Sequence, residues 1–426
     1  MFSFNALTRA AACAVLTGTL IWPAPSLAAD AAATAPALTL SEALERAARN
    51  HPSLARFPHR LQAADALRDQ AGRRRNPELG LEVENVFGSG ALGGTDAAEY
   101  TLSLSQVLET GGKRGLRTGL ADAERAAVRD EQRRAELDVV AETARRFVAV
   151  VEAQQLLELA RERMALADRA YAQVATRVEA GRTSVAERHK ARVAVLEARL
   201  AAQGIQRELD SARRELMAMF GEPPVAFGEA RGDLFTLAAI PELSTLEARL
   251  LDGPDLARYA NAQRRAEAEV ALARSVARQD ITVGGGVRRF QATGDTAFTL
   301  GLSMPLGIAD RNQGNVAAAR ARLDELGVER DAARIELHTL LAVAWDRLAS
   351  SRDRAVALRG EVATEAEQAL AVTEQGYAAG RLSWLELSDA QQLLLGVRSE
   401  AIHAAAEHHR IRIELERLTG RAIDAP

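Results

Sequence analysis

Apolar residues recur along this chain with two periods, and each period predicts a different element. From Lys113 to Glu179 no proline occurs, and apolar residues return every three or four positions, which predicts one very long helix. Residues 79–108 instead alternate apolar and polar side chains around a glycine-rich turn, which predicts two strands. Helical spacing before them predicts a helix over residues 40–74, with Ser41 as an N-cap type of residue at its start.

The same order of elements returns in the second half of the chain. A helix is predicted over residues 246–277, two strands within 281–306 and a second long helix over 312–377. Residues 298–306 align with residues 100–108 at one constant offset, which indicates an internal repeat. We therefore expect a first structural repeat over 29–221, a linker over 222–244, a second repeat over 245–420 and a tail at 421–426.

Each long helix is predicted to end in a Gly-Arg-x-Ser turn, at residues 181–184 and 380–383. Glycine stops the first helix because it adopts the left-handed conformation readily, and serine caps the helix that follows. Returning helices are therefore predicted over residues 185–220 and 384–418. Two equivalent turns favour a shared role, although two well-capped hairpins would show the same pattern.

The lengths of these elements indicate an α+β membrane protein with long antiparallel coiled-coil helices. A helix over residues 113–179 would be about 100 Å long at 1.5 Å per residue, and its apolar stripe has to pack on other helices. Four strands cannot close a transmembrane barrel, and lipid does not tolerate open strand edges, so several chains are expected to share one barrel. Three copies would give a barrel of about twelve strands, within the known range, although the pattern itself does not select three. A small soluble sheet with one buried face stays an alternative.

The alternation also predicts which side chains face lipid and which face the barrel lumen. The apolar set is expected to face lipid: Leu79, Leu81, Val83, Tyr100, Leu102, Leu104, Phe298, Leu300, Leu302 and Met304. The polar set is expected to line the lumen: Glu82, Glu84, Ser103, Ser105, Thr299 and Ser303.

Residues 1–28 have the features of a secretory signal peptide. Arg9 precedes an apolar stretch over residues 10–21, and Ser26 to Ala28 form a small-residue cleavage site, with cleavage expected after Ala28. The only cysteine, Cys13, lies inside this segment. The mature chain is therefore expected to have no disulfide and no cysteine metal ligand, and a lipidated N-terminus is not predicted.

Composition excludes several classes of function. The formal net charge of −4 argues against nucleic acid as a partner, and 4 % aromatic with 26 % charged residues is typical of long paired helices. No metalloprotease, phosphate-binding or nucleophile-elbow motif occurs, so neither an enzyme nor a cofactor site is expected. His403 and Glu407 are four residues apart and could share a metal, but with His408 and His409 they are interpreted as a structural cluster, and no metal site is predicted.

The duplicated architecture, the paired glycine turns and the segment Ser105-Gln-Val-Leu-Glu-Thr-Gly-Gly-Lys-Arg114 resemble the TolC-like outer-membrane efflux family. Within that family, the chain is similar to the CzcC-like components of heavy-metal efflux pumps. The resemblance implies a homotrimer in the outer membrane, with a twelve-stranded barrel and a long helical barrel in the periplasm. It also implies docking on a periplasmic adaptor and an inner-membrane RND-type transporter, and passive conduction of heavy-metal cations. A multidrug or solvent channel, or a periplasmic coiled-coil scaffold without a pore, are the alternatives.

The resemblance also implies roles for residues of the two turns. Tyr377 and Gly380 fit a family turn at the periplasmic entrance, with Glu386 and Asp389 on the helix that follows. These two acids are three residues apart and therefore share one helix face, either as part of a carboxylate ring at a gate or as an ordinary solvated face. The residues implied in adaptor docking are Gly181, Arg182, Ser184, Gly380, Arg381 and Ser383.

Overall fold

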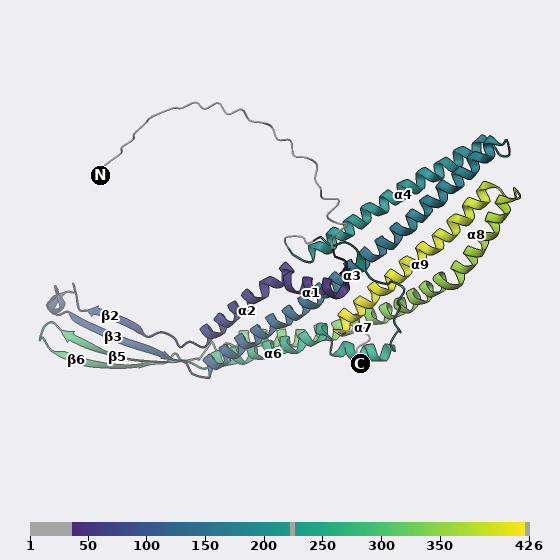
Figure 1. The fold of residues 1–426 in the computed structure, drawn as a ribbon. Helices are drawn as coiled ribbons and strands as arrows, with labels where there is room; N and C mark the ends of the chain where they lie inside the picture. Colours follow the sequence, from purple (N-terminus) through teal and green to yellow (C-terminus); the bar gives the residue numbers. More distant parts are fainter. Residues whose placement is uncertain (1–35, 222–225, 422–426) are drawn as a thin grey trace, which may run out of the picture.

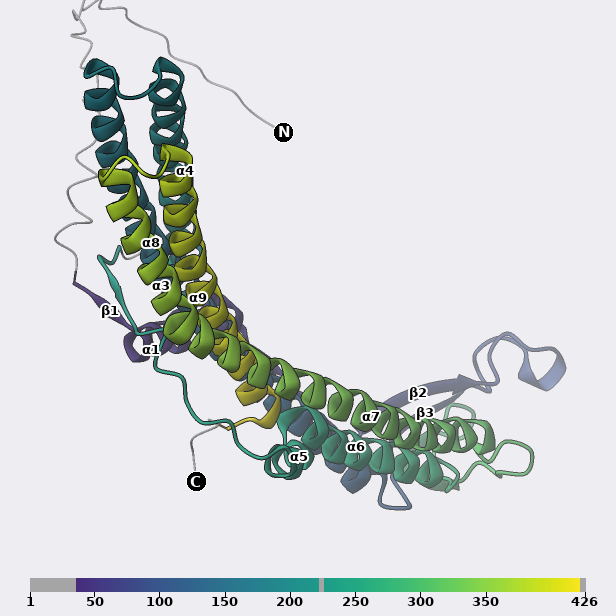
Figure 2. The same cartoon turned by 90° about the vertical axis from the view of Figure 1, so that its right-hand side faces the viewer.

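The computed structural model describes residues 36–221 and 226–421. The predicted signal peptide, part of the predicted linker and residues 422–426 of the predicted tail lie outside the described residues. The described chain is elongated, with a sheet at one end and two helical hairpins reaching the other end (Figure 1). Long helices run between the two ends, and Figure 2 shows that they curve along their length.

The sheet is formed by two hairpins that lie side by side. Its strands are β2 (Glu78–Glu84), β3 (Glu99–Leu108), β5 (Ile281–Phe290) and β6 (Thr296–Ser303), all antiparallel, in the order β2-β3-β5-β6. A short 3-10 turn, Gly90–Leu92, lies in the first hairpin. The fourth strand ends at Ser303, before Pro305, so the prediction that it extends to residue 306 was wrong because proline removes a backbone donor.

The register of the strands separates their two faces as the alternation predicted. Leu81 pairs with Leu102, and Leu102 with Val287, so these apolar side chains share one face. Gly80 pairs with Ser103, and Glu82 with Thr101, so the polar side chains share the other face. Met304, predicted to face lipid, follows the end of the last strand at Ser303 and is exposed, so the pairing register does not assign it to a face.

The first helical segment is broken in two, where the sequence predicted one helix. It consists of α1 (Leu40–Asn50) and α2 (Pro52–Ala71), because a proline cannot continue the hydrogen bonding of a preceding helix. The N-cap is Thr39 rather than Ser41, and Thr39 with Glu42 forms a capping box. A two-stranded parallel sheet of β1 (Leu38–Thr39) and β4 (Ala230–Arg231) lies beside α1.

The long helix of the first half has the predicted bounds. It is α3 (Lys113–Glu179, 67 residues), and α4 (Val185–Ala218) returns antiparallel to it. In the second half, α5 (Leu243–Leu251) and α6 (Pro254–Val276) are again separated before a proline, where one helix was predicted.

The second long helix is interrupted, which the sequence did not predict. It consists of α7 (Gln313–Ala357), a π-helical turn (Leu358–Val362) and α8 (Ala363–Ala378), and α9 (Trp384–Thr419) returns along it. π-helical turns are rare and often lie at functional sites. The two halves therefore share their order of elements but differ in the continuity of their long helices.

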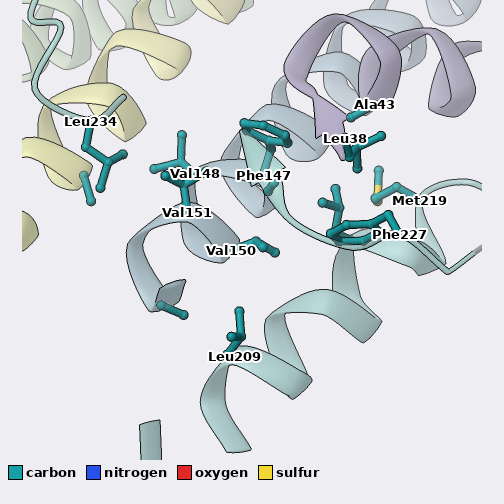
Figure 3. Packing of buried hydrophobic residues seen from close by; sticks show 14 of the residues in the cluster. Leu38, Ala43, Phe147, Val148, Val150, Val151, Leu209, Met219, Phe227 and Leu234 are labelled. Carbon is teal, nitrogen blue, oxygen red and sulfur yellow. The ribbon is translucent and has the colours of Figure 1, made fainter. Parts of the chain in front are cut away.

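Three clusters of buried side chains hold the helices together. One joins α3 to α1, α4 and the segment after residue 226, and includes Leu38, Phe147, Leu209 and Phe227 (Figure 3). A second packs α5 and α7 on α9, and a third lies near the ends of the two hairpins. None of the helices in the described ranges has an apolar stretch long enough for a membrane span.

Candidate functional site: the helical tips and the polar strand face

The two turns at the ends of the helical hairpins have the same backbone geometry. Gly181 and Gly380 adopt left-handed φ values of 69° and 74°. In the first turn Arg182 N–H donates to the Arg177 carbonyl over 2.8 Å, and in the second Arg381 N–H donates to the Gly376 carbonyl over 2.9 Å. This is the Schellman arrangement that ends a helix at glycine. We call residues 180–184 and 379–383 the tip turns.

Each tip turn passes into its returning helix through a serine cap. Ser184 accepts a hydrogen bond from the Glu187 N–H, and Ser383 accepts one from the Glu386 N–H. Glu386 accepts hydrogen bonds from the Ser383 N–H at 2.7 Å and the Ser383 hydroxyl at 2.8 Å, which completes a capping box. These two bonds hold the pKa of Glu386 below its usual range, and the bond from the Ser383 N–H has the larger effect.

The capping box changes the interpretation of the predicted acidic pair. Glu386 is exposed, but its carboxylate is directed onto its own turn. Asp389 is exposed one turn further along, and no ion pair involves it within the described residues. Of the two, Asp389 is therefore the carboxylate that is not bonded to its own turn, and the role of both in a gate stays a prediction.

The two hairpins are joined by a contact between Arg177 and Tyr377. The Arg177 guanidinium lies 4.0 Å from the centre of the Tyr377 ring, within cation–π distance. It also donates to the backbone carbonyl of Tyr377, and to that of Ala378 at 3.1 Å. The Tyr377 ring is buried, and burial raises the pKa of its phenol. Its hydroxyl has no partner in the part of the chain that the structure describes.

Apolar packing and a second arginine support this contact between the hairpins. Val174 and Ala191 of the first hairpin form one cluster with Tyr377, Trp384 and Leu387 of the second. Further from the tips, Arg398 of α9 bonds Glu162 of α3 at 2.8 Å and Glu367 of α8 at 2.8 Å. A groove of about 740 Å³ lies between the hairpins, lined by polar side chains that include Arg169, Gln173, Glu374 and Gln391.

The polar face of the sheet carries a charge cluster at the end far from the helices. Arg288 of β5 pairs with Glu84 of β2 and Glu99 of β3, each at 2.9 Å, and its Nε donates to the Thr101 hydroxyl at 2.9 Å. Asn85 donates to Glu99 at 2.9 Å. The predicted polar residues share this face: Glu82, Glu84, Ser103, Ser105, Thr299 and Ser303. Sequence reasoning missed Arg288 and Glu99, although an arginine that follows the glycine run 284–286 within a predicted strand was a visible signal.

The sequence model described as "Outer membrane efflux protein" matches residues 43–222 and 246–421, which is most of the chain. The chain belongs to the outer membrane efflux protein family. The predicted resemblance is thereby confirmed, and with it the place of the protein in the outer membrane.

Relatives within the outer membrane efflux family are resistance proteins. The cobalt-zinc-cadmium resistance protein CzcC of Cupriavidus metallidurans is 30 % identical over 384 residues, which cover 90 % of both chains. The nickel and cobalt resistance protein CnrC of the same organism is 28 % identical over 74 % of this chain and 76 % of CnrC. The chain therefore spans most of the length of both relatives.

Solved structures show the same fold at lower identity. CusC, described as forming a transmembrane channel, superposes with a TM-score of 0.76 at 20 % identity, covering 90 % of this chain and 92 % of CusC. The outer membrane protein VceC of Vibrio cholerae superposes with a TM-score of 0.73 at 18 % identity, covering 90 % of this chain and 97 % of VceC. The fold of this chain is therefore that of an outer-membrane channel with a long helical extension.

The three histidines of the predicted cluster on α9 each have a partner within the fold. His403 bonds Glu152 at 2.8 Å, His409 bonds the Leu234 carbonyl at 3.0 Å, and His408 is buried against α7. Glu407 pairs with Arg347 at 2.6 Å rather than with His403. The described residues contain no group of three or more His, Cys, Asp or Glu side chains arranged to hold a metal ion.

Proposed function

We propose that three copies of this chain form one passive duct through the outer membrane for heavy-metal cations. The observation that carries the proposal is the sheet, whose outer strands β2 and β6 each pair on one side only within the described residues. Phe298 and Leu300 on its apolar face are 87 % and 93 % exposed. Such an apolar face needs contact with lipid, and such open edges need neighbouring strands. Three copies would supply those strands as one barrel of about twelve.

The helices then form the periplasmic part of the duct. Their apolar side chains that one copy leaves exposed, among them Leu196, Leu200 and Val328, would pack between copies. The division into a first repeat over residues 29–221, a linker over 222–244 and a second repeat over 245–420 belongs to this proposal, as does secretion with a signal peptide at 1–28. Each repeat would contribute one strand hairpin and one helical hairpin to the trimer.

The tip turns would dock on a periplasmic adaptor and, through it, on an inner-membrane RND-type transporter. Gly181, Arg182 and Ser184 in one turn, and Gly380, Arg381 and Ser383 in the other, lie together at the end of the molecule that is farthest from the sheet (Figure 1). Tyr377, Glu386 and Asp389 would form the entrance beside them. The energy for transport would come from the transporter, since the duct only conducts.

Heavy-metal cations are the proposed substrate because the relatives are named for resistance to cobalt, zinc, cadmium and nickel. Deletion of the gene, followed by growth on these metals beside a panel of drugs and solvents, tests this assignment. We expect metal tolerance to fall and drug tolerance to stay unchanged. Unchanged metal tolerance with raised drug sensitivity would instead favour a multidrug channel.

A further inference from the structure

All four connections between the sheet and the helices meet at the same end of the sheet. The strand ends Glu78, Leu108, Ile281 and Ser303 lie together, since Leu108 pairs with Ile281 and Ser303 with Thr282 (Figure 1). The four connections, taken together with the adjoining ends of α3 and α6, are residues 72–77, 109–117, 274–280 and 304–312. We call these four segments the junction.

The junction is strongly basic in a chain that is weakly acidic. Its four segments contain nine Lys or Arg residues and three Asp or Glu residues, whereas the formal net charge of the whole chain is −4. The three acids already have partners. Asp280 pairs with Lys113 at 2.7 Å, Glu109 pairs with Arg117, and Asp310 accepts a hydrogen bond from the Asn312 N–H at 2.8 Å.

Six exposed arginines of the junction have no acidic partner among the described residues. Of these, Arg311 donates to the Gly307 carbonyl at 3.2 Å and Arg274 lies in the last turn of α6, and the inference uses the other four. The side chains of Arg73, Arg74, Arg114 and Arg278 have no ion pair or hydrogen bond with any residue of the described ranges. We call them the junction arginines. The side chain of Arg278 packs against Gly111. It lies so close that a Cβ added to Gly111 would be only 2.8 Å from the Cδ of Arg278. Exposed guanidinium groups at one end of a sheet that have no counter-charge favour the binding of an anion.

The position of the junction identifies that anion. On one side it borders the apolar strand face, and within it Leu306 and Ile308 are 72 % and 77 % exposed. Arginines that follow an apolar band lie at the depth of lipid headgroups, where basic clusters bind anionic lipids. Guanidinium groups also match phosphate geometry with paired hydrogen bonds.

We propose that the junction arginines bind the phosphate groups of anionic phospholipids in the leaflet on the side of the helices. The inference rests on the proposed function, because it needs the sheet to lie in a membrane. The bound lipids fix the depth of the sheet in the bilayer and neutralise the junction, where copies of the chain bring further arginines together.

Lipid selectivity of the purified protein tests this proposal. The protein is incorporated into vesicles of phosphatidylcholine and phosphatidylglycerol in equal amounts, extracted, and analysed for the lipids that stay bound. The wild type is expected to retain phosphatidylglycerol with an enrichment of about fivefold or more at low salt. Screening should reduce this enrichment as salt is raised.

Matched variants distinguish an effect of the junction arginines from an effect of exposed arginines elsewhere on the protein. The combined variant R73Q/R74Q/R114Q/R278Q should lose most of the enrichment, and the corresponding lysine variant should keep most of it. The control R163Q/R207Q/R214Q/R334Q removes four exposed arginines of the helices and should bind lipid as the wild type does. No enrichment in the wild type, or equal loss in both glutamine variants, would overturn the proposal.

Failure of this inference is distinguishable from failure of the proposed function. Formation of a heat-modifiable oligomer is measured first, in vesicles of phosphatidylcholine alone. An oligomer that shows no preference for anionic lipid contradicts only the role of the junction arginines. Failure of the wild type to enter vesicles of either composition contradicts the membrane placement, and both proposals with it.

Discussion

The Arg177 guanidinium of α3 lies 4.0 Å from the ring centre of Tyr377 at the end of α8. The same side chain donates to the carbonyls of Tyr377 and Ala378, so one residue joins the ends of both helical hairpins. The partners are 200 residues apart in sequence. At the tips, one stacked and hydrogen-bonded arginine therefore adds to the apolar cluster that holds the two tip turns together.

Replacing Arg177 with alanine is expected to loosen the second tip turn. The variant loses the cation–π contact and leaves two carbonyls without this donor, at a cost of about 1–2 kcal/mol in local opening free energy. Hydrogen exchange of the amides in residues 376–383 should accelerate correspondingly, while exchange in the middle of α3 should stay unchanged.

Tyr377→Phe is the matched control for this prediction. It keeps the ring under Arg177 and removes a buried hydroxyl that has no partner among the described residues, so it should slow or preserve exchange. Equal exchange rates in the wild type and Arg177→Ala would show that the contact does not hold the turn.

Arg288→Gln should raise the preference of the duct for cations. The change leaves Glu84 and Glu99 without their shared cation on the polar face of the sheet. Arg289→Gln removes the neighbouring arginine, which the register places on the apolar face, and should leave selectivity unchanged. Reversal potentials across a planar bilayer in a salt gradient measure the difference. Equal shifts in both variants would contradict the assignment of the faces.

Two helical glycines are expected to respond in opposite ways to alanine. A Cβ on Gly360 in the π-helical turn meets nothing within 4 Å, so Gly360→Ala should stabilise the helix by up to about 1 kcal/mol. A Cβ on Gly376 meets Leu382 Cδ1 at 2.5 Å and Cγ at 2.8 Å, so Gly376→Ala should cost about 1–3 kcal/mol by displacing the Leu382 side chain. The thermal midpoint of helix unfolding, followed by circular dichroism, should rise for the first variant and fall for the second. A fall in both would show that the π-helical turn requires glycine.

The buried His408 is expected to make the helical part sensitive to acid. It is 1 % exposed, and burial lowers its pKa to about 4, whereas the unfolded chain titrates near the ordinary value of 6.5. Between pH 4 and pH 6.5, this histidine is therefore protonated in the unfolded chain but not in the folded one. Stability should fall as the pH drops from 6.5 towards 4, by up to about 3 kcal/mol, and should not depend on this group at higher pH.

His408→Leu tests this dependence, with His189→Leu as an exposed control on α4. Thermal midpoints measured from pH 7 to pH 4 should decrease less steeply in His408→Leu than in the wild type. The control should follow the wild type throughout. If the thermal midpoint of His408→Leu fell with pH as steeply as that of the wild type, the acid sensitivity would come from other groups.

Local chemistry made several elements predictable from sequence. The bounds of α3 and the turns at Gly181 and Gly380 follow from helical spacing, glycine and a serine cap, all of which act within a few residues. The two faces of the sheet follow from alternation, because a strand places successive side chains on opposite sides. The breaks at Pro52 and Pro254 were also visible in the sequence, and the predicted continuous helices there gave too little weight to proline.

Long-range contacts could not be predicted in the same way. The cluster at Arg288 requires β5 to lie beside β3, and the two residues of its bond to Thr101 are 187 positions apart. The Arg177–Tyr377 contact likewise requires the two helical hairpins to pack together. The π-helical turn at Leu358–Val362 was not predicted either, and no local residue pattern signals it.

The central claim is that three chains close one barrel through the open edges of β2 and β6, and disulfide trapping tests it most directly. The only native cysteine is Cys13, so Glu82→Cys can be combined in turn with Ala297→Cys, Thr299→Cys and Gly301→Cys, all on the polar face. After oxidation in outer membranes, non-reducing electrophoresis should show covalent dimers and trimers, with trimers as the largest species. Monomers alone for every pair, or a ladder that continues beyond three chains, would contradict the trimeric duct.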